Sequence, residues 1–294
     1  CLRGNMRTEQ EMYDLILSTA RADERIRAVM LNGSRANPLA PPDFFQDFDI
    51  IYFVTDPAPF WRNLEWIRRF GELMILQLPD DMADPPPQGR VSYCYLMQFA
   101  DGNRIDLTIF PVDRLDRLEP DSLTVVLLDK DGVLPGYPPQ YLSDYLPRPP
   151  TTKQFFDCTN EFWWCSPYVA KGLWRQELPY ARAMLDLYVR EQLDKMLKWY
   201  IGVQNGFQIY PGKLGKYYQR YLPHELWQLL LKTYADGSYE QSWQALLAMG
   251  ELFRLTARRV AEHFGYAYPE GEDERVTAHL QHVRQLPHDA VEMY

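Results

Sequence analysis

Two aspartates separated by one residue, Asp47 and Asp49, open an apolar run that continues to Val54. The run predicts a strand, and because side chains alternate along a strand, both carboxylates point to one face, about 7 Å apart. Two carboxylates this close repel each other unless a positive charge lies between them. Hard divalent cations with oxygen ligands, above all magnesium together with a substrate phosphate, suit this arrangement. The pair therefore predicts a metal site.

A glycine-serine turn, Gly33 and Ser34, ends the apolar run that precedes this pair. Glycine lets the backbone approach a phosphate closely, and the serine hydroxyl and nearby amides can donate hydrogen bonds to phosphate oxygens. Taken singly, the turn carries almost no information, and an aspartate pair in a strand is more often a solvent-facing edge. Together they indicate a phosphate cradle beside a metal site, and so phosphoryl or nucleotidyl chemistry.

A third carboxylate, Asp106, lies in the alternating segment 104–110, which predicts another strand with Asp106 and Thr108 on its polar face. Three carboxylates can hold two divalent ions about 4 Å apart, which stabilises the attacking and leaving oxygens of an in-line displacement at phosphorus. We therefore predict Asp47, Asp49 and Asp106 as metal ligands and catalytic residues.

The elements that must position these residues change in kind near residue 150. Short β-rich runs come first, at residues 28–31, 49–54, 73–78, 91–99, 104–110 and 124–128, with helical segments at 7–22 and 59–70. After a stiff proline-rich segment, long helical patterns follow at 153–176, 179–204, 223–234, 238–264 and 273–285. We expect an α+β domain with a mixed sheet over residues 1–150, of which 1–5 look like a leader, and an all-α helical bundle over 151–294.

Composition narrows the choice of partners. The chain has 294 residues, 46% of them apolar, and a formal net charge of −9 at pH 7. An acidic chain is a poor candidate for binding nucleic acid, which relies on neutralising phosphates. No stretch approaches the roughly 20 apolar residues that a membrane span requires. We expect a soluble, cytoplasmic protein that is a monomer or a weak homo-oligomer, with neither nucleic acid nor membrane as partner.

The stretches around these carboxylates resemble a known family. They look like the polymerase-β-like nucleotidyltransferase superfamily and, within it, the aminoglycoside 6-adenylyltransferases, also called streptomycin adenylyltransferases. The resemblance spans both expected domains and rests on residues 33–38, 41–50, 70–77, 79–81, 104–108 and 168–175. This sequence differs from the family's pattern at Phe48, where the family has tyrosine, and in the proline-rich loop 82–89. The loop bears on which substrate is preferred.

The resemblance implies transfer of AMP from MgATP to a hydroxyl of streptomycin, with release of pyrophosphate. It implies a nucleotidyltransferase domain followed by a helical domain that binds substrate and caps the nucleotide. Asp47 and Asp49 would bind magnesium, two ions being expected, and ATP would be the co-substrate. Asp106 would bind the second ion and assist removal of the hydroxyl proton, although Glu161, Glu177 or water remain alternative proton acceptors.

Further contacts are expected for the nucleotide and for the acceptor. The nucleotide contacts would be Gly33, Ser34, Arg35, Lys171, Lys213 and Lys216, with Lys171 indicated by the resemblance and the last two by a basic, glycine-rich loop. A cationic, hydroxylated acceptor requires carboxylates and aromatic platforms. The candidates are Asp157, Glu161, Trp163 and Glu177, although one of the neighbours Trp163 and Trp164 belongs in the core.

Two other functions remain open from the sequence. A non-catalytic nucleotide-binding regulator of the same superfamily is disfavoured by the intact carboxylate trio. A nucleotidyltransferase acting on a protein or on another small hydroxylated cation would use the same metal site, so the sequence does not separate it from an aminoglycoside enzyme.

Overall fold

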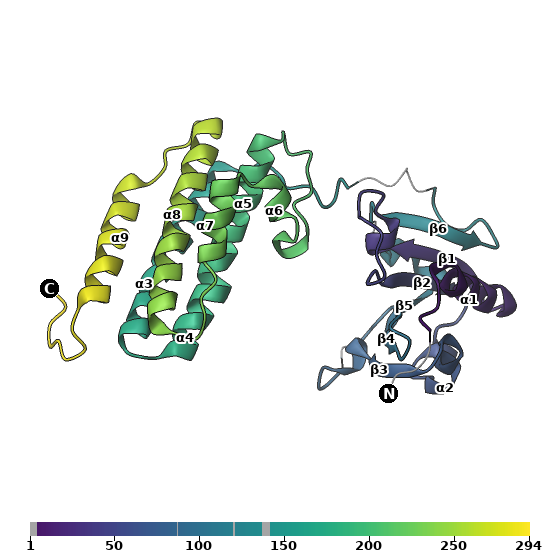
Figure 1. The fold of residues 1–294 in the computed structure, drawn as a ribbon. Helices are drawn as coiled ribbons and strands as arrows, with labels where there is room; N and C mark the ends of the chain where they lie inside the picture. Colours follow the sequence, from purple (N-terminus) through teal and green to yellow (C-terminus); the bar gives the residue numbers. More distant parts are fainter. Residues whose placement is uncertain (1–4, 87, 120, 137–141) are drawn as a thin grey trace. The chain divides into compact units, whose positions relative to one another are not determined.

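The computed structural model describes residues 5–86, 88–119, 121–136 and 142–294 of the chain (Figure 1). Two compact units divide it, residues 1–144 and residues 145–294. Residues 1–4 of the expected leader and Pro87 of the proline-rich loop lie outside the described residues. Within the described ranges, no helix has the length and apolar character needed to cross a membrane.

The described part of the first unit is built on a six-stranded mixed sheet. In chain order its strands are β1 (Ile26–Asn32), β2 (Phe48–Val54), β3 (Leu73–Gln77), β4 (Tyr93–Phe99), β5 (Arg104–Pro111) and β6 (Thr124–Asp129). In space the order is β3-β4-β5-β2-β1-β6, and only the central neighbours β2 and β5 run parallel among these described strands. The two strands that carry the predicted aspartates are therefore direct neighbours.

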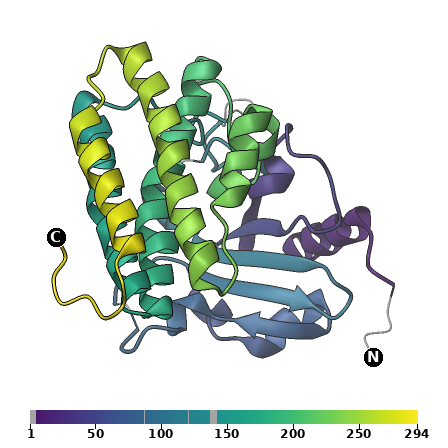
Figure 2. The same ribbon diagram turned by 60° about the vertical axis from the view of Figure 1, so that its left-hand side comes forward.

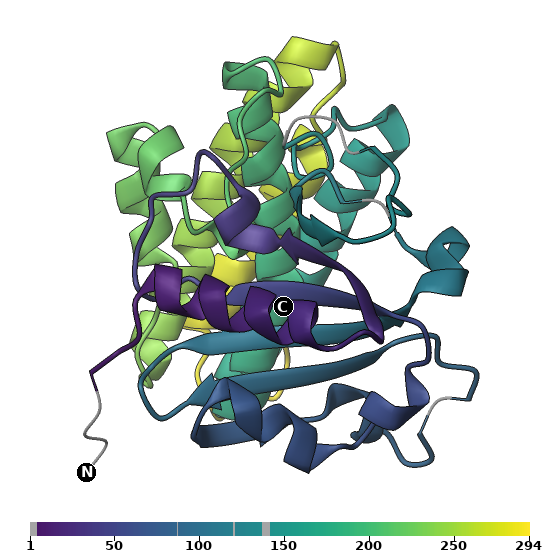
Figure 3. The same ribbon diagram turned by 90° about the vertical axis from the view of Figure 1, so that its right-hand side faces the viewer.

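Helix α1 (Glu9–Ala22) covers one face of this sheet, as Figure 3 shows. Its apolar side packs on alternate residues of β2, including Phe48 and Tyr52, both of which are fully buried. The Tyr52 hydroxyl also donates a hydrogen bond of 2.6 Å to the carbonyl oxygen of Ile16 in α1. Because successive side chains of a strand point to opposite faces, Asp49 lies on the face away from α1.

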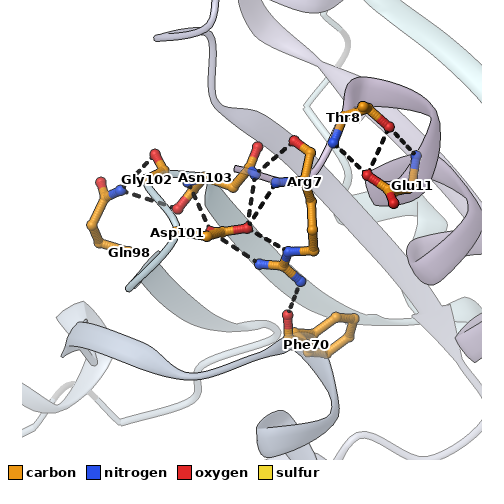
Figure 4. Close-up of polar contacts among 8 residues, drawn as sticks. All are labelled: Arg7, Thr8, Glu11, Phe70, Gln98, Asp101, Gly102 and Asn103. Carbon is orange, nitrogen blue, oxygen red and sulfur yellow. Dashed lines mark hydrogen bonds and ion pairs between the residues drawn. The ribbon is translucent and has the colours of Figure 1, made fainter. Parts of the chain in front are cut away.

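Arg7 fastens the segment before α1 to the turn between β4 and β5 (Figure 4). Its Nε lies 2.6 Å from Asp101 Oδ2, and its Nη1 donates to the carbonyl oxygen of Phe70 at 2.5 Å. The helix then begins with a capping box, in which Thr8 and Glu11 bond each other's backbone amides. The start of α1 is thus held by an ion pair to the sheet and by its own cap.

The single helix expected over residues 59–70 is wrong. Three short segments take its place: Ala58–Phe60, α2 (Leu64–Ile67) and Arg68–Phe70. Arg62 interrupts them with a left-handed φ of +55°, and the Asn63 side chain caps α2 by accepting a bond from the Trp66 amide. A left-handed residue cannot continue a right-handed helix, and this part of the chain turns instead.

The second unit is a helical bundle. Its helices are α3 (Thr152–Trp174), α4 (Leu178–Ala183), α5 (Arg190–Gln204), α6 (Tyr218–Tyr221), α7 (His224–Lys232), α8 (Tyr239–Phe264) and α9 (Glu270–Gln285). A π-helical segment, Met184–Val189, joins α4 to α5. The long helices lie side by side in Figure 2, around a core in which Phe162 stacks on Phe253 at a ring separation of 3.8 Å. The expected fold class, a mixed sheet with helices followed by a helical region, is confirmed.

Candidate active site

The three predicted aspartates converge where the parallel strands β2 and β5 begin. Asp49 and Asp106 are direct partners in the register of these strands, and Asp47 precedes β2 by one residue. Asp49 and Asp106 line a cavity of about 290 Å³ together with Gly33 and Thr108. The parallel register brings together carboxylates that are far apart in the sequence.

Gly33 lies against Asp49 and has a positive φ of +73°. A Cβ atom built on Gly33 would be 2.0 Å from Asp49 Oδ2, which no real structure allows. Position 33 therefore requires glycine both for its backbone conformation and for the closeness of the carboxylate. The neighbouring Ser34 is half-buried, and within the described ranges its hydroxyl makes no hydrogen bond, so it is available to a ligand.

Burial and neighbouring charges raise the proton affinity of Asp47 and Asp49. Burial, followed by the charges of Asp106 and Asp47, raises the pKa of Asp49 to about 6. Burial also raises the pKa of Asp47, against the opposing charge of Arg104. Crowded, half-buried carboxylates of this kind favour a cation between them.

Arg104 supplies a positive charge at this position. Its Nε lies 2.7 Å from Asp106 Oδ1 and its Nη2 lies 2.8 Å from Oδ2, so the contact is bidentate. The same Nε is 3.6 Å from Asp47 Oδ2. Among the described residues, no three acidic, histidine or cysteine side chains are arranged to hold a metal ion. The oxygen donors fit magnesium in kind and number, provided that Asp106 is released from Arg104.

Arg35, expected as a nucleotide contact, is bound within the protein. Its Nε and Nη2 donate to the backbone carbonyl oxygens of Asp47 and Gln46, at 3.1 and 2.8 Å. Its Nη1 pairs with Glu9 at 2.9 Å, and the guanidinium lies 3.8 Å from the centre of the Phe48 ring. Only 7% of the side chain is exposed, and these contacts hold the segment that presents Asp47.

Three residues at the site were not predicted from the sequence. Arg104 was missed, although it stands two residues before Asp106 and so shares its strand face. Asn32, the register partner of Asp49, and Asp121 also line the cavity. Asp121 precedes β6 and accepts a bond from the Leu123 amide at 2.8 Å. Nothing in the sequence indicates that β6 pairs with β1 and brings Asp121 to this place.

Comparison with known proteins identifies the family. The sequence profile described as streptomycin adenylyltransferase matches residues 6–283. The chain belongs to this family. It is 41% identical to an aminoglycoside 6-adenylyltransferase of Bacillus subtilis over 94% of this chain and 98% of that one. A Campylobacter jejuni protein of the same name is 42% identical over 90% and 92% of the two chains. The chain also matches a crystal structure of an aminoglycoside 6-adenyltransferase from Bacillus subtilis, with 37% sequence identity and a TM-score of 0.47. That match covers 95% of this chain and all of the other one.

In this adenylyltransferase the lysines expected to bind phosphate lie at different levels of the bundle. Lys171 is near the end of α3, whereas Tyr218, two residues after Lys216, bonds Asp194 of α5. Asp194 lies level with the start of α3, because Cys158 donates to the carbonyl oxygen of the nearby Gln192. At 1.5 Å per residue, Lys171 is about 20 Å farther along the bundle axis. The two groups of lysines therefore stand at different levels of the bundle, and their roles are separate predictions.

Asp157 and Glu161 share a polar cavity of the adenylyltransferase's second unit. The cavity has a volume of about 680 Å³ and is also lined by Lys195 and Trp199. Asp157 pairs with Lys153, and both carboxylates lie on the first half of α3. The structure thus brings two of the expected acceptor contacts together with an indole ring and a basic group.

The other two expected acceptor contacts lie elsewhere. Trp163 is only 2% exposed, and its indole N–H donates to the Tyr268 hydroxyl, whereas Trp164 is 63% exposed. Trp163 is therefore the core member of the pair and offers little surface to an acceptor. Glu177 is exposed at the start of α4, and its amide donates to the carbonyl oxygen of Gly172, which lies about 16 Å beyond Glu161 along α3 by the helical rise of 1.5 Å per residue. Glu177 is thereby separated from the other carboxylates.

Proposed function

We propose that this adenylyltransferase transfers AMP from MgATP to a hydroxyl of streptomycin and releases pyrophosphate, thereby inactivating the antibiotic. The observation that carries the proposal is the convergence of Asp47, Asp49 and Asp106 at the Gly33 turn, where burial and mutual repulsion raise the pKa of Asp49. The names of the relatives, aminoglycoside 6-adenylyltransferases, support the acceptor class.

The roles of the residues follow from their chemistry. Asp47, Asp49 and Asp106 would hold two divalent ions, which when bound neutralise the triphosphate and lower the pKa of the attacking hydroxyl. Gly33 keeps the backbone close to Asp49, and the Ser34 hydroxyl would donate to a phosphate oxygen. Asp106, once free of Arg104, would also take up the hydroxyl proton. Catalysis would then consist mainly of positioning and charge neutralisation.

The acceptor contacts would come from the carboxylates of α3. Streptomycin carries two guanidinium groups, and Asp157 and Glu161 offer the carboxylates that such groups bind through paired hydrogen bonds. Trp199, in the same cavity, offers an aromatic surface to a cation.

Pyrophosphate release from MgATP tests the reaction, measured with streptomycin, with other aminoglycosides and without acceptor, followed by mass spectrometry of the drug. Release that depends on streptomycin, with an adenylyl mass added to it, is the expected result. Release that requires another aminoglycoside would overturn the choice of streptomycin. Label appearing on protein instead of drug would overturn the acceptor class.

A pair of variants tests which basic group binds the triphosphate. Lys171 has no ion-pair partner among the described residues, and we propose that it binds the phosphates. Lys171→Ala should raise the KM for ATP about tenfold or more and leave the acceptor KM unchanged. Lys213→Ala is the matched control, because Lys213 lies in the short turn that precedes Tyr218, whereas Lys171 lies near the end of α3. A larger effect of the control on the ATP KM would reverse the assignment.

A further inference from the structure

Arg104 lies at the position where a cation would be expected among the carboxylates. Its bidentate contact engages both oxygens of Asp106, at 2.7 and 2.8 Å, and its Nε also faces Asp47. A divalent ion on the same oxygens would lie beside the guanidinium, and two positive charges at that distance repel strongly in a half-buried site. The guanidinium and a metal ion are therefore competitors for Asp106.

The surroundings of Arg104 allow it to leave. In the part of the chain that the structure describes, its guanidinium is bonded only to Asp106 and faces Asp47, and its side chain is 38% exposed. Arg35, on the other side of Asp47, contrasts with it: that side chain is 7% exposed and is bonded to two backbone carbonyls. One arginine is fixed to the backbone, and the other is held by the carboxylates alone.

We propose that Arg104 is the resident counter-ion of the carboxylate site and sets its metal affinity. It holds Asp106 and shields Asp47 in the absence of metal, and it must release Asp106 before a divalent ion can be bound by all three carboxylates. This inference rests on the proposed function only in taking the three aspartates as the metal site. Arg104 is thus a positioning residue, and it raises the concentration of divalent ion at which the site fills.

Direct binding of Mn²⁺ to the nucleotide-free protein tests the exchange, with free Mn²⁺ measured by electron paramagnetic resonance. Arg104→Met keeps the apolar length of the side chain but removes the competing charge, so its Kd for Mn²⁺ should be about tenfold lower than that of the wild type. Arg104→Lys, which keeps the charge but not the bidentate contact, should fall between them.

The control is Arg27→Met. Arg27 also pairs with one aspartate, Asp131, through two nitrogens, but it stands at the far end of β1 from the site. This variant changes the net charge equally and should leave Mn²⁺ binding unchanged. Equal tightening in both variants would show a general charge effect and would overturn the proposal.

Added guanidinium ion supplies a second readout. At low millimolar concentrations, far below those that unfold proteins, it should weaken Mn²⁺ binding to Arg104→Met by refilling the position of the lost side chain. The wild type, whose position is already filled, should not respond. Weaker or unchanged Mn²⁺ binding in Arg104→Met would show that Arg104 orients the carboxylates instead of competing for them. A different result would show that the three aspartates are not the metal site at all. In that case Asp49→Asn would bind Mn²⁺ as tightly as the wild type does.

Discussion

Replacement of Gly33 by alanine tests whether the turn at the end of β1 sets the geometry of the carboxylates. The added Cβ would lie 2.0 Å from Asp49 Oδ2, whereas ordinary contacts begin near 3.4 Å. The carboxylate must therefore retreat by about 1.4 Å, and a displacement of about 1 Å at a reacting centre lowers rates about 100-fold. We expect kcat/KM for pyrophosphate release to fall at least that far, together with Mn²⁺ affinity.

The same substitution also strains the backbone, and this effect needs a control. Alanine at a φ of +73° destabilises the fold by about 1–2 kcal/mol, whatever lies near its side chain. Gly132→Ala is matched, since Gly132 has a φ of +64° and nothing within 4 Å of the added Cβ. Both variants should show similarly lowered melting temperatures, and only Gly33→Ala should lose activity. Normal kcat/KM in Gly33→Ala, with the shared loss of stability, would refute the reasoning.

Three further predictions concern the charges around the site. Asp47→Asn should lower kcat about 100- to 1,000-fold, because it removes a predicted metal ligand. It should not lower the melting temperature, because it removes one of several crowded negative charges. Asp116→Asn, at an exposed position, should change neither kcat nor the melting temperature. The raised pKa of Asp49, about 6 against an ordinary 3.8, means that the folded state holds this proton more tightly than the unfolded chain. Its stabilising contribution is full below about pH 4 and is lost as the pH rises through 6, so thermal melts of the metal-free protein should show a falling melting temperature that Asp49→Asn flattens. Arg35→Lys loses the forked contacts with the backbone, and it should raise the Mg²⁺ concentration for half-maximal rate about tenfold. The rate should recover in excess Mg²⁺, and the acceptor KM should not change. Glu9→Gln removes only the exposed partner of Arg35 and should behave as wild type; an equal effect of the two variants would contradict the role given to the backbone contacts.

The sequence predicts the strands that carry the aspartates, because the alternation of apolar and polar residues around Asp49 and Asp106 is strong. It does not predict that these strands are parallel neighbours, since β3 and β4 lie between them in the chain and strand order depends on the folded sheet. The direct contact of Gly33 with Asp49 follows from the register and from a positive φ, neither of which the residue types specify.

Long-range contacts also fix surroundings of the candidate residues that the sequence does not show. Arg35 stands beside the glycine-serine turn and invites a phosphate role, yet the loop returns to it and its guanidinium is bound by carbonyls of residues 46 and 47. Trp163 and Trp164 cannot be told apart by type, and the direction of the neighbouring helices decides which is buried. The separation of Lys171 from Lys216 depends likewise on how α3 and α5 are aligned.

The anchoring of α1 has a consequence for how the first unit opens. Arg7 binds Asp101 in the β4–β5 turn, Glu9 binds Arg35, and the Tyr52 hydroxyl of β2 bonds the helix at Ile16. A helix bound at one point can fray independently, but this one is joined to the β4–β5 turn, to the Gly33–Ala36 segment and to β2. We therefore expect the amide hydrogens of α1 to exchange with solvent when the central strands open, with α1 and β2 behaving as one cooperative unit.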